Sequence, residues 1–315
     1  MSVANTAIKD DNRLWGNESI CLGLPGFNVQ FIGLSLTQKH CLVAEFEQFL
    51  LIELPDQSAP SRLLTCQTEQ LDSPLDIPIE ELQQDNQYNP KIMKSDDVLS
   101  ITGYNFLASF GLNEKIDTVA KLAVFEELEL TEMSVIENFL RVYCAYNAVA
   151  LSGAVLHSAG LVFDNEAIIF VGYSNVGKTT LTRKAYGEGA TILSDDVNLI
   201  LPSVNGFQAF KVPFTGEFGR TLDHRNFCNS FPLCAVVLLE QAEQLSAVLV
   251  NPVFAISRLL AGTPFVNMDE AQVVSLFDIY MSLTNTLPII RLCLPKESSI
   301  NEIYKVINAA IVDNG

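Results

Sequence analysis

The distribution of hydrophobic and polar positions divides the chain into two parts. Up to about Leu130, short apolar runs such as Val29 to Leu34 and Cys41 to Ile52 alternate with turn residues, a pattern typical of strands in a small α+β unit. Between Pro55 and Asp97 apolar runs are scarce, and Pro, Gln, Asn, Asp and Glu predominate. That stretch predicts a long solvated excursion. The pattern therefore predicts a smaller N-terminal α+β domain, residues 1–130, whose role the sequence does not indicate.

The second part, residues 131–315, alternates short strands with helices and predicts an α/β domain. Thr131 is expected to cap a helix whose apolar positions recur at helical spacing as far as Ala150. The last helix is expected to open with a capping box formed by Ser299 and Glu302 and to run to Val312. Further helices are predicted from Lys178, from Asn251 with Pro252 in its first turn, and over Glu270 to Leu283. The predicted strands are Gly160 to Asp164, Ala167 to Val171, Thr191 to Leu193, Val197 to Leu201, Ala235 to Glu240, Ala247 to Val250 and Ile289 to Cys293.

The least polar stretch, Cys144 to Phe163, is long enough to raise the question of a membrane span. Polar residues such as Asn147 interrupt it, and Gly153 and Gly160 break a continuous helix. The stretch is therefore interpreted as a helix end, a turn and a strand.

Composition limits the partners and the compartment. The chain has 315 residues, 49% of them hydrophobic, which is enough to form a large core in one or two domains. The formal net charge of -18 argues against a nucleic acid or an anionic membrane as partner. Seven cysteines without a CxxC pair suit buried thiols in a reducing compartment, and the polar N-terminus lacks the layout of a secretory signal. We therefore expect a cytoplasmic protein.

One loop carries the clearest chemistry. The sequence GYSNVGKT satisfies G-x-x-x-x-G-K-[ST], follows an apolar strand and precedes a helix, which is the context that phosphate binding requires. Backbone N–H groups and the helix N-terminus would hold the phosphates of ATP, Lys178 would reach the terminal phosphates, and the Thr179 hydroxyl would ligate Mg²⁺. The predicted nucleotide-binding residues are Gly172, Ser174, Asn175, Val176, Gly177, Lys178, Thr179 and Thr180.

Two carboxylates follow the loop at Asp195 and Asp196, directly after a short apolar strand. A strand ending beside the loop would bring one carboxylate near Mg²⁺ and the other near an attacking hydroxyl. His157 lies shortly before the strand that leads into the loop, and is either catalytic or a packed residue. Arg220 and Glu217, in PFTGEFGR, are candidates for substrate or phosphate contacts, with a solvated turn as the alternative.

The run LHSAGLVFDNEAIIFVGYSNVGKTTLTRKAYGEGATILSDDVNL resembles the catalytic core of the HPr serine kinase/phosphorylase family. The close resemblance covers Leu156 to Leu199, and a looser one extends to PIIRLCLP. It implies a fold similar to phosphoenolpyruvate carboxykinase, with the phosphate loop set in a mixed sheet. It also implies that Asp195 is the base that accepts a serine hydroxyl proton, with His157 orienting it and Asp196 near the metal. The two aspartates can exchange these roles.

This sequence departs from that family at two points. Asn175 stands where many members have Gly, and Asn tolerates the positive φ that the loop needs. The downstream signature of the type E-I-R-G-L-G is missing, so the acceptor is left open between a protein, a peptide and a small hydroxyl compound. The family's tendency to assemble also makes a homo-oligomer an open alternative.

The sequence thus predicts an ATP- and Mg²⁺-dependent kinase that acts on a serine or another hydroxyl. The first alternative is a module that binds ATP without transferring phosphate. SNVGKTTL also looks like the first motif of small GTPases, but no D-x-x-G or N-K-x-D element follows it. Carboxykinase-like lyase chemistry would call for a cluster of cationic residues, which the acidic chain does not show.

Overall fold

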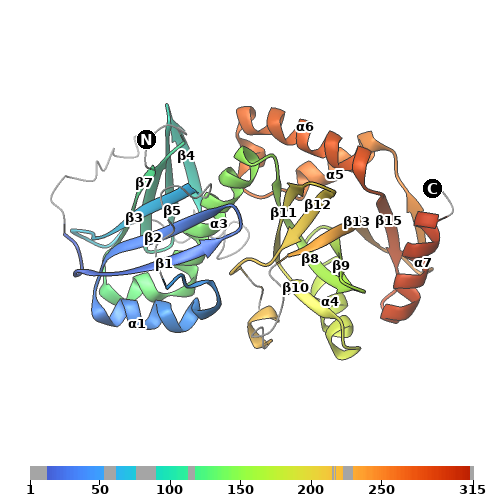
Figure 1. The fold of residues 1–315 in the computed structure, drawn as a ribbon, viewed down its shortest axis with the longest axis horizontal. Coiled ribbons are helices and arrows are strands. Elements are labelled where there is room, and N and C mark those ends of the chain that lie inside the picture. The colour runs from blue at the N-terminus through green and yellow to red at the C-terminus, as the bar shows by residue number, and fades with distance from the viewer. Residues whose placement is uncertain are drawn as a thin grey trace. The chain divides into compact units, whose positions relative to one another are not determined.

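The computed structural model describes residues 13–52, 62–75, 90–112, 118–214, 216, 218–222 and 230–312. The chain is a mixed α/β protein with two compact units, Met1–Phe139 and Leu140–Gly315, which are described separately below (Figure 1). The boundary between the units falls inside helix α3 (Met133–Ala150). The domain division at residue 130 that the sequence suggests stays a prediction.

The N-terminal unit contains a seven-stranded mixed sheet in the order β1-β2-β3-β7-β6-β5-β4. Strands β2, β3 and β7 run parallel at its centre, and the remaining neighbours are antiparallel. Helix α1 (Leu36–Glu45) contacts β1 and the 3-10 helix η2 (Glu127–Thr131). The strands are β1 (Glu18–Leu24), β2 (Phe27–Leu34), β3 (Arg62–Gln70), β4 (Lys91–Ser95), β5 (Val98–Gly103), β6 (Phe106–Gly111) and β7 (Thr118–Val124).

Two sequence-based predictions for this unit are wrong. The run Cys41 to Ile52 is not a strand but belongs to α1 and the 3-10 helix η1 (Glu47–Phe49). Ser35 and Gln38 form a capping box that starts α1, and this local signal outweighs the apolar run. In the predicted solvated excursion, residues 55–61 and 76–89 lie outside the described residues. The described part contains β3, which pairs on both sides, and Leu64 is completely buried there.

The C-terminal unit contains an eight-stranded mixed sheet in the order β10-β8-β11-β12-β13-β15-β14, with β9 pairing with both β8 and β13. Strands β9, β13 and β15 are parallel, and the other pairs are antiparallel. Because β9 pairs with both β8 and β13, the circuit β8-β11-β12-β13-β9 closes on itself. The strands are β8 (Ala154–Phe163), β9 (Glu166–Val171), β10 (Thr191–Ser194), β11 (Val197–Ser203), β12 (Gly206–Phe210), β13 (Ser230–Gln241), β14 (Ser246–Leu249) and β15 (Ile289–Leu294).

Helices pack on this sheet and close its core. Helix α4 (Lys178–Gly187) contacts β8 and β10, and α7 (Ile300–Val312) contacts β14 and β15 (Figure 1). Helices α5 (Pro252–Ala261) and α6 (Glu270–Thr286) pack on each other. Most predicted strands and helices of this unit are confirmed, but β8 begins at Ala154 and β13 at Ser230, well before the predicted starts, and β12 was not predicted. The remaining described 3-10 helices are η3 (Gly219–Thr221) and η4 (Val266–Met268).

The predicted helix caps are confirmed in two cases and wrong in one. The Asn251 side chain accepts the Phe254 N–H at 2.9 Å, and Ser299 and Glu302 form the predicted capping box. Thr131, predicted as the cap of α3, instead lies in η2 and donates its hydroxyl to the Leu128 carbonyl. An extra 3-10 turn precedes the helix and shifts its start.

The apolar stretch from Cys144 is a helix end, a turn and a strand, as predicted, since α3 ends at Ala150 and β8 begins at Ala154. In the described part of the chain, none of the helices combines the length and the apolar character that crossing a membrane requires.

Candidate functional site

The loop between β9 and α4 has the backbone shape that its glycines permit. Gly177 has φ +111° with no atom within 4 Å of an added Cβ, and Asn175 has φ 64°. A Cβ on Gly172 would lie 2.6 Å from Val176 Cγ1, so the loop closes tightly only on a glycine there. The Gln241 side chain, at the end of β13, donates to the Asn175 carbonyl at 3.0 Å and ties the loop to the neighbouring strand.

Lys178 lies across this loop with its side chain almost fully buried. Its Nζ donates to the Gly172 carbonyl at 2.7 Å and to the Tyr173 carbonyl at 3.2 Å. Burial lowers the pKa of Lys178 to about 8, although the negative charge of Asp196 acts in the opposite direction. The ammonium therefore sits at the start of the loop and is sensitive to pH in the mildly alkaline range.

The first turn of α4 presents its amides to the same loop. The first intrahelical bond is donated by Leu181 N–H to the Gly177 carbonyl at 2.9 Å, so the amides of Lys178, Thr179 and Thr180 precede the helical ladder. These amides and the helix dipole give this end a positive potential. Thr179 and Thr180 are exposed, so their hydroxyls are accessible from solvent.

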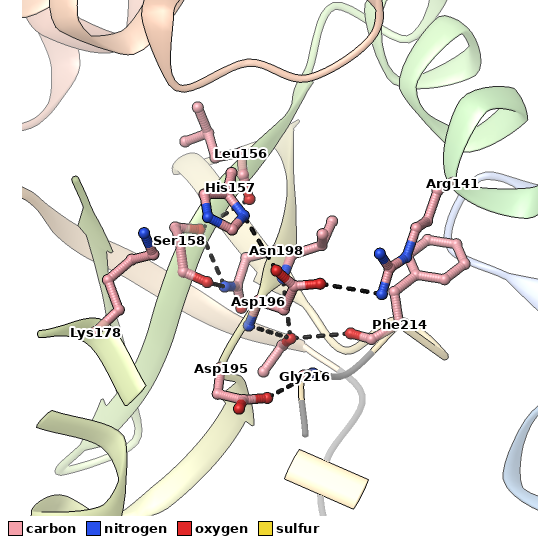
Figure 2. A network of polar contacts seen from close by, with 12 residues as sticks. Arg141, Leu156, His157, Ser158, Lys178, Asp195, Asp196, Asn198, Phe214 and Gly216 are labelled. Atoms are coloured by element: carbon pink, nitrogen blue, oxygen red, sulfur yellow. Dashed lines mark hydrogen bonds and ion pairs between the residues drawn. The ribbon is translucent and has the colours of Figure 1, made fainter. Parts of the chain in front are cut away.

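Asp196 joins a histidine and an arginine from two other elements (Figure 2). Its Oδ1 lies 3.1 Å from His157 Nδ1 on β8, and its Oδ2 lies 3.0 Å from an Arg141 nitrogen on α3. The antiparallel pairing of β8 with β11, which puts His157 opposite Val197, brings the histidine to this position. The Arg141 side chain is 5% exposed, so this ion pair has a buried cation.

The contacts of Asp196 determine its charge and the histidine tautomer. Burial by itself raises the pKa of Asp196, but the hydrogen bond from His157 and the charges of Arg141, His157 and Lys178 outweigh it and leave the pKa lowered. Asp196 is therefore an anion at neutral pH. A carboxylate only accepts hydrogen bonds, so His157 Nδ1 carries the proton and Nε2 is the ring atom that can accept one.

Asp195 points to a different partner. Its side chain is 4% exposed, and Oδ1 accepts the Gly216 N–H at 2.7 Å (Figure 2). A Cβ on Gly216 would lie 2.6 Å from Asp195 Oδ2, so this approach requires a glycine. The preceding Ser194 hydroxyl donates to the Phe214 carbonyl at 2.9 Å. The end of β10 therefore anchors the segment that leads to Arg220.

The structure brings some of the predicted residues together and separates others. Lys178, His157 and Asp196 form one cluster, since His157 bonds to Asp196 and the Lys178 charge acts on it. Asp195 adjoins this cluster in sequence but binds Gly216. Arg220 lies in η3 with an exposed side chain, and Glu217 lies outside the described residues. His157 contacts Asp196 rather than Asp195, which matches the exchanged assignment of the two aspartates; their roles stay predictions.

Several polar residues of this cluster were not predicted. Arg141 is the clearest, and its signal was a lone arginine among the apolar positions of ENFLRVYCAY. Asn198 is completely buried and donates to the Ser158 carbonyl at 2.8 Å and to its hydroxyl at 3.0 Å. These groups hold β8, β10 and β11 in register around the carboxylates.

The donor set fits Mg²⁺ bound together with phosphates. Among the described residues no group of three or more His, Cys, Asp or Glu side chains could hold a metal ion. Mg²⁺ ordinarily uses one or two carboxylates and takes its other oxygens from phosphates and water. Both oxygens of Asp196 face donors, whereas Asp195 has one oxygen bound to the Gly216 amide. Asp195 and Thr179 are therefore the residues that fit the ion.

Comparisons with known proteins gave one family match. A family model described as "SynChlorMet cassette protein ScmC" matches residues 119–292. Among solved structures, this chain is similar to the Hpr(Ser) kinase/phosphatase from Coxiella burnetii with 11% sequence identity and a TM-score of 0.28, over 51% of this chain and 95% of that chain. The search of curated proteins produced no match. The resemblance to the HPr kinase family therefore stays a prediction from the motifs.

Proposed function

We propose that the C-terminal unit of this protein is a kinase for a hydroxyl acceptor. The chain belongs to the family described as SynChlorMet cassette protein ScmC. The donor would be ATP with Mg²⁺, bound at residues 172–179. The observation that carries the proposal is that His157, which is bonded to Asp196, lines one pocket together with Gly172 and Tyr173 of the loop. With phosphates bound at this loop, as its sequence predicts, a proton acceptor would lie beside them, which supports in-line phosphoryl transfer.

The binding step uses the loop and the first turn of α4. The amides of Gly177 to Thr180 would donate to the phosphates, and Lys178 would exchange its bonds with the Gly172 and Tyr173 carbonyls for bonds to the terminal phosphates. Both of these carbonyls belong to the start of the loop, so the terminal phosphate would lie at that end. The same geometry supports a fold of the phosphate-loop kinase type within the mixed sheet.

In the transfer step, His157 would accept the hydroxyl proton of the acceptor. The acceptor oxygen bonds to the γ-phosphorus, the bond from that phosphorus to the β–γ bridging oxygen breaks, and ADP leaves. The hydroxyl proton passes to His157 Nε2, and Asp196 stabilises the resulting imidazolium through Nδ1–H. Arg141 keeps Asp196 ionised and oriented. When bound, Mg²⁺ would neutralise phosphate charge, with Thr179 and Asp195 as its protein ligands.

This assignment differs from the one that the family resemblance implies, in which an aspartate is the base and His157 orients it. Asp195 has one oxygen bound to the Gly216 amide and lies apart from the His157–Asp196 pair, whereas His157 has a ring nitrogen, Nε2, that can accept a proton. The contacts therefore favour the His157–Asp196 pair as the base and Asp195 near the metal. Arg220 is proposed to contact the transferred group from its loop.

The test combines a binding measurement with a transfer measurement. Calorimetry with ATP and Mg²⁺ measures binding, and γ-radiolabelled ATP incubated with the protein and fractionated cell extract measures transfer to any acceptor. Lys178→Ala is expected to abolish both signals, and the matched Lys184→Ala, on the last turn of the same helix, is expected to retain both. Binding of ATP without transfer of label to any fraction would contradict the kinase and support the non-catalytic module. Absence of ATP binding would contradict the whole proposal.

A further inference from the structure

A pocket of about 160 Å³ lies beside the start of the phosphate loop. Its wall combines residues of β8, the loop, β13 and α5. Among the residues that line it are His157, Gly172, Tyr173, Leu238, Arg258 and Gly262. The backbone N–H of His157 donates to the Gly262 carbonyl at 2.8 Å, so the residue that follows α5 is bonded to the strand that carries the histidine. The pocket is therefore formed by connected, regular elements.

The pocket lies at the terminal-phosphate end of the loop. Gly172 and Tyr173, which line it, are the two residues whose carbonyls accept bonds from Lys178 Nζ. In a loop of this sequence the lysine reaches the β- and γ-phosphates. A group bound in the pocket would therefore face the phosphate that is transferred.

The enclosed volume of the pocket is small. About 160 Å³ is below the roughly 300–1,000 Å³ of pockets for drug-sized ligands. A compact acceptor therefore matches this volume better than a nucleoside does.

Arg258 supplies a fixed positive charge in the wall. Its guanidinium carbon lies 4.4 Å from the centroid of the Tyr173 ring, and one of its nitrogens donates to the Tyr173 hydroxyl. A second nitrogen lies 3.7 Å from Glu240, a separation longer than a hydrogen bond. A guanidinium has five N–H donors, so these two partners leave donors for a ligand carboxylate, which it can bind bidentately.

His157 is the second functional group of the wall. Its Nδ1 is bonded to Asp196, so Nε2 is the ring nitrogen that remains for a ligand hydroxyl. Of the other lining residues, Tyr173 and Ser174 carry hydroxyls, and the rest are apolar residues and glycines such as Leu238 and Gly262. One anion-binding group and one hydroxyl-binding group thus share a pocket of small volume.

We propose that this pocket binds the acceptor and that the acceptor is a small hydroxy acid, with its carboxylate on Arg258 and its hydroxyl at His157 Nε2. The inference rests on the proposed kinase function and names its substrate class. In the reaction the hydroxy acid oxygen bonds to the γ-phosphorus of ATP, ADP leaves with the bridging oxygen, and the hydroxyl proton moves to His157. The product is a phosphorylated hydroxy acid and ADP.

Glycerate and glycerol are the probes, because they share the hydroxyls and differ in the carboxylate. Binding is followed by the imidazole NMR signal of His157, which is assigned among the three histidines by its loss in His157→Gln. We expect glycerate at millimolar concentration to shift this signal and glycerol to leave it unchanged. Equal shifts with both compounds, or none with glycerate, would overturn the inference.

Arg258→Met tests the carboxylate contact. Loss of a charged hydrogen-bonding group is expected to weaken glycerate binding roughly 10- to 100-fold while ATP affinity stays the same. Arg183→Met is the matched control, since Arg183 also lies over an aromatic ring, that of Phe218, but does not line the pocket. Equal glycerate affinity in Arg258→Met and the unmodified protein would contradict the proposed site.

A second measurement separates this inference from the kinase proposal. Glycerate is incubated with the protein, ATP and Mg²⁺, and phosphoglycerate is measured by mass spectrometry. Formation of phosphoglycerate supports both. Arg258-dependent glycerate binding without any ATP-dependent transfer would leave the pocket assignment standing and contradict the kinase. Transfer of label to other acceptors without glycerate binding would support the kinase and contradict the pocket assignment.

Discussion

In the described part of each unit, an ion pair has a largely buried member, and the two pairs differ in which member is buried. In the N-terminal unit, Lys121 pairs with Glu69 at 3.4 Å, and the lysine side chain is 28% exposed. In the C-terminal unit, Arg141 pairs with Asp196 at 3.0 Å, and the arginine side chain is 5% exposed. A lysine can extend its charge to water along a flexible chain, whereas a buried guanidinium depends on its partner.

Both units bury charged side chains, among them Glu69 and Glu137 in the N-terminal unit, but the C-terminal unit gathers them at one place. Other buried polar groups of the N-terminal sheet complete the backbone, as Thr68 does by donating to the Ile32 carbonyl at 2.9 Å. In the C-terminal unit, Lys178, Asp195 and Arg141 are all buried within the described cluster around the loop. Such a concentration of buried charge contributes little net stability, and it is typical of a site that binds or transfers charged groups.

The largest effect is expected from breaking the Arg141–Asp196 pair. Arg141→Met leaves an ionised carboxylate without its cation, so we expect the free energy of opening at β10 and β11 to fall by about 3–5 kcal/mol. Lys121→Met is the counterpart in the N-terminal unit. It should lower the free energy of opening at β3 and β7 by about 1 kcal/mol or less, because water reaches the Lys121 side chain. Hydrogen exchange of strand amides measures both. Equal losses in the two units would remove the distinction.

The next effect concerns the anchor between Asp195 and Gly216. Gly216→Ala brings a Cβ to 2.6 Å from Asp195 Oδ2, so we expect the segment around Gly216 to detach at a cost of about 1–3 kcal/mol. Limited proteolysis between β12 and β13 should become faster, with hydrogen exchange in β2 and β3 unchanged. Gly187→Ala, where an added Cβ meets no atom within 4 Å, is the control. Unchanged proteolysis in Gly216→Ala would show that the anchor does not hold the segment.

A smaller effect follows from the pKa of Lys178. A pKa lowered to about 8 means that the free protein carries the charge below pH 8 and loses it as pH rises through that value. ATP needs the charged form, so affinity should fall about tenfold between pH 7 and pH 9, following the charged fraction. Lys178→Arg, which stays charged, should bind ATP with little change over that range. A steep loss in both proteins would assign the pH dependence to another group.

The smallest effect is expected from the loop glycine. Gly177→Ala puts a side chain at φ +111°, which strains the backbone, and we expect ATP binding to weaken by about 1 kcal/mol, roughly fivefold. Asn175→Gly relaxes a residue at φ 64° and should bind as well as the unmodified protein. Calorimetry compares the two. Equal affinities in all three proteins would show that the loop backbone tolerates a side chain at residue 177.

Local patterns predicted most strands and helices of the C-terminal unit, although not β12. Its strands, and the starts of α5 and α7, depend on contiguous signals such as the Asn251 cap and the Ser299–Glu302 box. In the N-terminal unit the same reasoning failed for Cys41 to Ile52 and missed β3. There the capping box of Ser35 and the pairing of β3 with β2 and β7 decided the outcome. Pairing between distant strands leaves little local trace.

By itself, the sequence determined the phosphate-loop candidate, because its glycines, its lysine and the start of α4 act within ten consecutive residues. Only the tertiary structure decided the rest of the site. Antiparallel pairing of β8 with β11 brings His157 to Asp196. The Gly216 amide, far along the chain, binds Asp195, and Arg141 on α3 pairs with Asp196. These partners are far apart along the chain, and only packing determines which of two adjacent carboxylates meets which donor.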